Sequence, residues 1–410
     1  MPRLFVDTRP LRENRNFRLL YFGQLVSLLG SNLTIVAVPY QVYHETHSSL
    51  WVGLASGIQL PFLIAGSLWG GAMGDRLDKR TLLVLGSFVS ALLSAGLALN
   101  AQLHRSHLVV LLALAAVAAG VAGFVGPIRS AAIPKMVKPD QLIAAYSLNQ
   151  VLMNLGTVLG AALAGVLLAA VGLSSCYVID ALTFIALAVF TLFMSAMKPS
   201  GEHTGTAMLR AIGDGFRYVR TNAIAQAVYL ADLNAMVFGL PRALLPARAI
   251  AVYHGGPRTL GLLYAASSVG ALVMAIFTGW IDRVRRQGRL IAVVVMAWGA
   301  SMALFGIVHV LWVGLGCPAF AGATDVISTI LRNYVLQNAI TDEFRGRISS
   351  VQMAVVTGGP RLGDLESGVV AGLTTVEFSI VSGGVACIVG ILALIRGRPA
   401  FWKDEAARPT

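Results

Sequence analysis

Long apolar runs follow one another along nearly the whole chain, separated by short polar or charged stretches. Each run holds about 20 predominantly apolar residues, the length at which an α-helix crosses the hydrocarbon core of a bilayer. Taken in order, the runs predict twelve spans, at 17–42, 50–73, 81–101, 108–126, 142–170, 174–196, 222–250, 259–281, 290–309, 312–333, 349–374 and 378–396. Because lipid satisfies no backbone hydrogen bond, spans of this kind are helices. The pattern therefore predicts an all-α polytopic membrane protein.

Composition supports this class and excludes a soluble globular protein. Hydrophobic residues make up 56% of the chain and charged residues only 12%, about half the charged fraction of soluble domains. The net charge of +12 does not indicate a nucleic-acid partner, because the cations are spread over short connections between spans. There they act as topology determinants and contact anionic lipid headgroups. The predicted partner is the lipid bilayer.

The distribution of cations predicts the orientation. Most of the 31 Lys and Arg residues fall in the N-terminal arm, in the connections after even-numbered spans and in the C-terminal tail, which places both termini in the cytoplasm. The exceptions are Arg105, Arg242, Arg248 and Arg258, predicted outside, and Arg361 within a span. Residues 1–16 are too charged for the apolar core of a cleaved signal peptide. The three isolated cysteines indicate neither a disulfide framework nor a metal site, and we expect no cofactor.

The chain divides at its longest polar interruption, 197–221. This predicts a cytoplasmic arm at 1–16, a six-helix bundle at 17–196, a cytoplasmic linker at 197–221, a second six-helix bundle at 222–396 and a cytoplasmic tail at 397–410. The halves repeat each other. Asp75-Arg76 is echoed by Asp282-Arg283, Arg129 aligns with Arg332 at an offset of 203, and the same offset carries Gly156, Gly160 and Gly165 onto Gly359, Gly363 and Gly368. The repeat predicts two bundles related by a pseudo-twofold axis along the membrane normal.

The connection between the second and third spans carries the most specific motif, Gly-Ala-Met-Gly-Asp-Arg-Leu-Asp-Lys-Arg at 71–80. It resembles the cytoplasmic loop G-x-x-x-D-R-x-G-R-R of the major facilitator superfamily. The matching residues are Gly71, Asp75, Arg76, Lys79 and Arg80, while Asp78 stands where the family usually has Gly. The resemblance implies a conformational latch between the bundles, echoed in the second half by Asp282 and Arg283. The alternative is an ordinary positively charged loop.

Further stretches resemble the bacterial branch of that superfamily that includes the enterobactin exporter and drug-efflux proteins. They are 16–24, 36–43, 127–134, 344–350 and the charged cluster of the eleventh span. The resemblance implies a monomeric exporter in the bacterial inner membrane that carries a siderophore- or drug-like amphiphile in exchange for protons. An uptake porter or uniporter of the same fold is the alternative. Scattered histidines and the absence of a G-x-x-x-x-G-K-[ST] motif argue against an enzyme or an ATP-driven pump.

Charged residues inside predicted spans are the candidates for proton coupling, because hydrocarbon rejects a charge that has no partner or water. They are Asp232 in the seventh span, Asp325 in the tenth, and Arg361, Asp364 and Glu366 in the eleventh. Arg361 and Asp364, at i and i+3, are expected to pair on one helix face. The alternative for all five is a structural ion pair, and the sequence does not single out one proton-carrying carboxylate.

Polar residues in the first and seventh spans are the candidates for a substrate cavity: Gln24, Asn32, Gln41, Asn234 and Arg242. Hydrogen bonding between helices is the alternative for their amides. In the fifth span Gly156, Gly160 and Gly165 are predicted to permit close helix packing. They match the superfamily's antiporter motif, although Ala161 and Ala164 replace its Pro and Gly. The fourth span, 108–126, contains no Arg, so we expect any proton route to run through the C-terminal half.

Overall fold

The computed structural model describes residues 7–103, 107–197, 213, 217–239, 241–284, 286–339 and 345–398. All regular structure in these ranges is helical, which confirms the all-α class. Most of the predicted linker and tail lies outside the described residues. The chain forms two compact units: unit 1 comprises 1–45 and 58–208, and unit 2 comprises 46–57 and 209–410. The division differs from the predicted one in that the first residues of the second span belong to unit 2.

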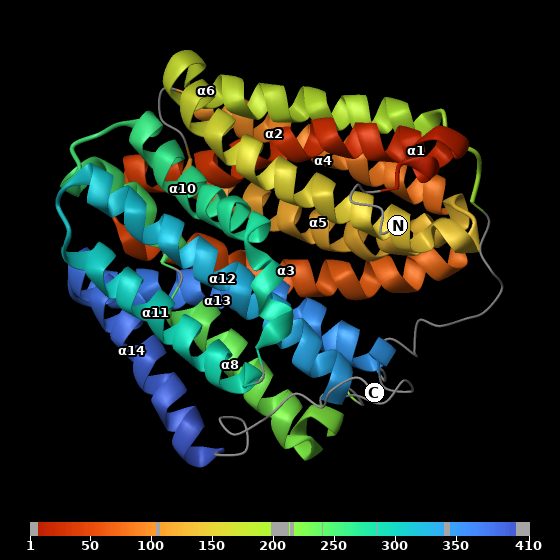
Figure 1. Cartoon of the computed structure of the whole chain (residues 1–410). Helices are drawn as coiled ribbons and strands as arrows, with labels where there is room; N and C mark the ends of the chain where they lie inside the picture. The colour runs from red at the N-terminus through yellow and green to blue at the C-terminus, as the bar shows by residue number, and fades with distance from the viewer. Residues whose placement is uncertain are drawn as a thin grey trace. The chain divides into compact units, whose positions relative to one another are not determined.

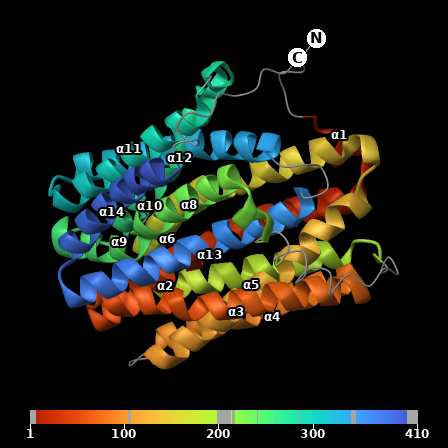
Figure 2. The ribbon, with the colours of Figure 1, turned by 90° about the horizontal axis from the view of Figure 1, so that it is seen from below.

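Unit 1 is a bundle of long helices joined by short connections. Its elements are α1 Arg9–Glu13, α2 Arg15–Thr46, most of α3 Ser49–Arg76, α4 Lys79–Gln102, α5 Leu108–Met136, η1 Pro139–Gln141 and α6 Leu142–Leu192. Helix α4 packs along α5 and α6 (Figure 2). Where α3 meets α5, a Cβ added to Gly70 would lie 2.0 Å from the carbonyl oxygen of Phe124. Such contact between backbones requires small residues, as in other membrane helix pairs.

A single residue interrupts α6. Gly172 has φ 81° and ψ 174°, while the residues before and after it continue as helix. This backbone conformation is one that residues with a Cβ rarely adopt. The break agrees with the two spans predicted at 142–170 and 174–196, and it reduces the expected connection between them to one glycine.

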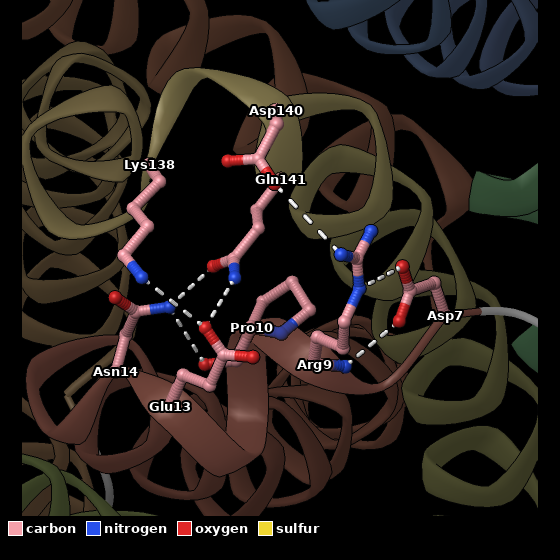
Figure 3. A network of polar contacts seen from close by, with 8 residues as sticks. All are labelled: Asp7, Arg9, Pro10, Glu13, Asn14, Lys138, Asp140 and Gln141. Carbon is pink, nitrogen blue, oxygen red and sulfur yellow. Dashed lines mark hydrogen bonds and ion pairs between the residues drawn. The ribbon is translucent and has the colours of Figure 1, made fainter.

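The predicted N-terminal arm is partly folded onto the bundle (Figure 3). Asn14 donates from its amide to the side-chain oxygen of Gln141 at 2.7 Å, and Gln141 donates to the carboxylate of Glu13 at 2.7 Å. Lys138 adds an ion pair to Glu13 at 3.5 Å. Because Gln141 is only 1% exposed, these contacts fix α1 against the connection between α5 and α6.

Arg9 forms the other half of the same network (Figure 3). Its Nε donates to the Asp7 carboxylate at 2.7 Å, and an Nη lies 3.8 Å from Asp140. The hydrogen bond and charge of Asp7 raise the pKa of Arg9 above its ordinary value. Asp7 therefore favours the charged form of Arg9.

Unit 2 is also a helical bundle, but several of its helices are shorter or interrupted. Its elements are α8 Ala223–Phe238, η2 Arg242–Leu244, α9 Leu245–Ala247, η3 Arg248–Val252, α10 Pro257–Ile276, η4 Thr278–Arg283, α11 Gln287–Ile307, α12 Leu311–Ala339, α13 Arg345–Leu373 and α14 Val376–Gly397. Helix α11 lies beside α12 and α14, and α8 contacts α13 and α14 (Figure 1). The seventh span, predicted as one helix over 222–250, is interrupted after Phe238 and continues as short 3-10, α and π turns.

Arg248 shows why that interruption is stable. The sequence counts it among the outside cations, but its side chain is fully buried in unit 2. It donates to the carbonyls of Phe305, Gly306 and Val308 and to the Tyr253 hydroxyl. These carbonyls belong to the last turn of α11, where backbone oxygens lack helical partners. Arg248 therefore closes the end of α11 from the interior.

The number of spans is consistent with twelve. Within the described residues, ten helices are long and apolar enough to cross a membrane. One of them, over 139–192, contains the break at Gly172 and is long enough for two spans. Helix α13, with 29 residues, is long enough for the remaining span but is not among the ten, and it carries the predicted charged cluster.

Candidate functional site

The main candidate site is a buried charge cluster in unit 2 that joins α8 to α12. Arg332 on α12 lies 2.7 Å from the carboxylate of Asp232 on α8 and 3.6 Å from that of Asp325 on its own helix. The side chains of Arg332 and Asp232 are 4% and 2% exposed, whereas that of Asp325 is 41% exposed. Thr329 bridges Arg332 and Asp325: its hydroxyl accepts a hydrogen bond from Arg332 at 2.9 Å and donates one to Asp325 at 3.4 Å.

The two carboxylates of this cluster differ in what they can do. Asp232 is held by a short ion pair away from solvent, and separating it from Arg332 would leave two uncompensated buried charges. Asp325 interacts with Arg332 at longer range, and 41% of its side chain is exposed. With all three groups ionised the cluster carries one net negative charge. Asp325 is therefore the less constrained of the two carboxylates, while Asp232 is the direct partner of Arg332.

Arg332 was not among the predicted site residues, because the sequence places it at the cytoplasmic end of the tenth span. Two signals point to it. It lies seven residues after Asp325, two turns along the same helix face, and it is the repeat equivalent of Arg129. The fourth span as predicted, 108–126, contains no Arg, but its helix is longer than predicted. Helix α5 continues past residue 126 to Met136 and includes Arg129. The predicted boundary failed because Pro127 and Pro134 do not end the helix.

The charged cluster of α13 is arranged differently from the expected i, i+3 pair. Asp364 accepts hydrogen bonds from the Ser56 hydroxyl at 3.0 Å and from the Ala243 backbone N–H at 3.0 Å. Within the described residues Arg361 forms no ion pair with Asp364 under 4.0 Å, because other donors occupy that carboxylate. Ser56 belongs to the α3 residues of unit 2, and Ala243 lies in η2. Asp364 thus secures the interruption of the seventh span.

The remaining charged candidates of unit 2 surround these carboxylates. Arg242 is exposed at the start of η2 and interacts electrostatically with both Asp325 and Asp364. Glu366 is half-buried on α13. Asn234, expected to line a cavity, donates its amide to the Cys387 carbonyl at 2.8 Å and so ties α8 to α14.

In unit 1 the amide candidates lie buried in α2. Asn32 donates to the carbonyls of Leu28 and Gly156, and Gln41 donates to Glu45 while accepting from the Tyr177 hydroxyl at 2.9 Å. Gln24 is buried, and its amide nitrogen makes no hydrogen bond. For Asn32 and Gln41 the geometry corresponds to hydrogen bonding between helices, the alternative that the sequence left open.

The predicted packing glycines lie at a close helix contact. A Cβ added to Gly156 would come within 2.1 Å of the Leu28 side chain, and one added to Gly160 within 2.5 Å of Asn32, both on α2. Their repeat equivalents Gly359 and Gly363 face Met236 of α8 at 2.9 Å and 2.3 Å. Gly165 is buried on the same helix α6. The equivalent glycine pairs make the same type of helix contact in both units.

A buried carboxylate of unit 1 was not expected from the sequence. Asp180 is 1% exposed and accepts hydrogen bonds from Thr34 at 2.6 Å and Ser94 at 2.8 Å. Its other oxygen has no hydrogen-bond partner. Three helices, α2, α4 and α6, meet at this residue. The sequence feature that could have identified Asp180 is the presence of an Asp within an apolar run.

The loop predicted as a latch joins α3 to α4 and contacts the end of α6. Asp78, the departure from the family pattern, is the N-cap of α4: its carboxylate accepts from the N–H groups of Arg80 and Met197, both at 2.9 Å. Lys79 is buried and donates to the Gly74 carbonyl, and Arg80 donates to the Leu192 carbonyl. Gly71, Asp75 and Arg76 lie in the last turns of α3.

The second-half echo, Asp282 and Arg283, lies in η4, and the side chains of both lie outside the described residues. No group of three or more metal-ligating side chains is found in the described part of the chain.

A twelve-span arrangement of repeated bundles with buried charges is the architecture of a major facilitator superfamily transporter, and comparisons with known proteins agree. A solved bacterial homologue of the human lysosomal transporter Spinster has the same fold, with a TM-score of 0.74 at 14% identity, over 98% of this chain and 100% of that one. The nucleoside transporter NupG matches with a TM-score of 0.72 at 12% identity, over 93% and 99%.

The chain belongs to the transmembrane secretion effector family of this superfamily, whose model matches residues 7–410. The enterobactin exporter EntS of Citrobacter koseri is 30% identical over 390 residues, covering 94% of this chain and 92% of that protein. The EntS of Salmonella typhimurium is 28% identical over 389 residues, covering 94% and 93%. The predicted superfamily and branch are confirmed.

Proposed function

We propose that this protein exports a siderophore-like amphiphile across the bacterial inner membrane by alternating access, in exchange for protons. The relatives support the substrate class, since the two EntS proteins are named as enterobactin exporters. The observation that carries the coupling is the sharing of Arg332 between a sequestered carboxylate, Asp232, and a partly exposed one, Asp325.

The proposed coupling follows from the charge of this cluster. With Asp325 ionised, the cluster carries one net negative charge and favours an environment open to water. When Asp325 takes up a proton, Arg332 and Asp232 form a neutral pair that can be enclosed at lower cost. A proton on Asp325 thus permits a closure that the ionised cluster opposes, and this linkage couples proton movement to the transport cycle. Asp232 acts as a positioning residue that keeps Arg332 in place.

The latch and the cavity complete the proposal. The loop from Gly71 to Arg80 controls the switch between the conformational states of the transport cycle. Asp75 and Arg76 are the charged residues through which it acts. Among the predicted cavity residues, Gln24 has an amide nitrogen without a hydrogen bond and Arg242 is exposed, and we assign both to substrate binding. The protein works as a monomer with both termini in the cytoplasm.

The test is transport by the purified protein in liposomes with an imposed pH gradient, with enterobactin as the substrate. We expect substrate-dependent proton flux in the wild type. Asp325→Asn should abolish that flux while exchange of labelled for unlabelled enterobactin continues, because exchange needs no net proton movement. Asp325→Glu is the matched control and should retain coupling.

The results that contradict the proposal are separable. Wild-type transport without proton flux would refute antiport, and proton flux in Asp325→Asn at the wild-type level would remove this residue from coupling. Accumulation in the opposite direction under the same gradient would favour the uptake alternative.

A further inference from the structure

A groove lies between α8 and α14, within unit 2, and has a volume of about 550 Å³. The two helices are neighbours in the bundle (Figure 1). Apolar side chains form most of its wall: Leu230, Leu233, Val237 and Phe238 from α8, and Ile391 and Leu394 from α14. From Leu230 to Phe238 the wall extends about 12 Å along α8, at 1.5 Å per residue. Leu230 is 44% exposed, so the groove is open along part of its length.

The groove has few polar side chains, and they differ in charge and in hydrogen bonding. The Asn234 amide already donates to Cys387 of α14. Arg398, just beyond the end of α14, is the charged side chain that lines the groove, and it lies at one end, where it donates to the Ala223 carbonyl at 3.4 Å. No acidic side chain lines it in the described part of unit 2. The result is an apolar trough with a single cation at its mouth.

This arrangement matches an amphiphile with an anionic head and a hydrocarbon tail. In a membrane helix pair, the hydrocarbon available to fill an apolar groove is a lipid acyl chain. The cation stands where α14 ends, and basic groups next to the ends of membrane helices attract anionic headgroups. The groove has too few free polar groups to recognise a substrate by its functional groups.

We propose that the groove between α8 and α14 is a binding site for an anionic phospholipid, whose phosphate lies at Arg398 and whose acyl chain lies along Leu230, Val237 and Ile391. The proposal is independent of the exported substrate and of proton coupling, since it concerns retention of lipid by the purified protein.

The experiment is native mass spectrometry of the full-length protein, mixed with equal amounts of phosphatidylglycerol and phosphatidylcholine of identical acyl chains. We expect the wild type to retain phosphatidylglycerol preferentially. Arg398→Gln should reduce that retention about fivefold, the effect of one basic group near an anionic headgroup. Arg398→Lys should restore most of it. Arg396→Gln is the matched control: it removes the same charge from the same helix, at an exposed position that does not line the groove.

A second variant tests the apolar wall. Ala393 lines the groove and is exposed, so Ala393→Phe fills the space without disturbing the core and should displace the lipid. Equal losses in Arg398→Gln and Arg396→Gln would show that only net surface charge matters and would overturn the proposal. Equal retention of both lipids by the wild type would also overturn it, as would undiminished retention by a folded Ala393→Phe protein.

Discussion

Removing the Arg332 charge should destabilise unit 2 more than removing the charge of its short-range partner. Arg332→Gln leaves Asp232 buried beside Asp325 with no cation between them, and the net charge of the cluster changes from −1 to −2. Asp232→Asn leaves Arg332 with Asp325, and the net charge becomes zero. The two substitutions remove the same 2.7 Å contact but leave very different charges behind.

The structure sets the size of each effect. The pair is 4% and 2% exposed, so solvent screens it little, and removing one partner of a buried pair costs about 3–5 kcal/mol. We expect that range for Arg332→Gln. For Asp232→Asn we expect about 1–3 kcal/mol, the cost of weakening hydrogen bonds to a buried charged group. The double variant should lose at least about 1 kcal/mol less than the sum, because the two side chains interact directly.

The measurement is the free energy of unfolding in mixed micelles, followed by circular dichroism as the denaturing detergent is increased. Arg396→Gln, an exposed cation of the same unit, is the control and should change stability by less than about 0.5 kcal/mol. Equal losses in Arg332→Gln and Asp232→Asn would refute the charge argument. Additive losses in the double variant would show that the ion pair contributes nothing of its own.

Three further predictions concern unit 1. Asp78→Ala should cost about 1–2 kcal/mol of unfolding free energy because α4 loses its N-cap, whereas Asp78→Asn should retain most of it; equal losses would show that capping is not the cause. Gly160→Leu should lower the free energy of unfolding by about 1–3 kcal/mol through overpacking against Asn32. The control Gly126→Ala, where a Cβ meets nothing within 4 Å, should be neutral or slightly stabilising. An unchanged free energy of unfolding in Gly160→Leu would contradict the packing argument. Asp75→Asn should slow transport while leaving substrate affinity intact; a parallel loss of affinity would assign the loop to the binding site instead.

The span pattern was predictable because hydrocarbon imposes a strict rule on it. A helix must be about 20 apolar residues long to cross the membrane, and this rule located most of the long helices of the structure within a few residues. It failed at the end of α5 and in the seventh span, which is interrupted after Phe238. Helix α5 continues for ten residues beyond its last predicted position because Pro127 and Pro134 are accommodated within it.

The arrangement of the charges was less predictable, because partners come from different helices. Asp232 lies in an apolar run, where a carboxylate needs a partner or water. The actual partner, Arg332, lies 100 residues away in sequence, and no local spacing connects the two. Asp364 likewise pairs with Ser56 and a backbone N–H instead of the arginine three residues before it. Sequence spacing identifies neighbours on one helix, whereas packing chooses the partner between helices.

The break at Gly172 has a practical consequence for experiments on membrane topology. Two helical stretches joined at one glycine leave no extended segment at that turn, so a protease, which needs extended chain, has little to cut there even though residues 170–172 are exposed. The connection between η3 and α10 is different: His254, Gly255 and Gly256 lie outside any helix, and His254 has a positive φ. On the predicted outer side, cleavage sites and reporter tags belong at 253–256. Lack of cleavage at residue 172 would not report the orientation of the chain in the membrane.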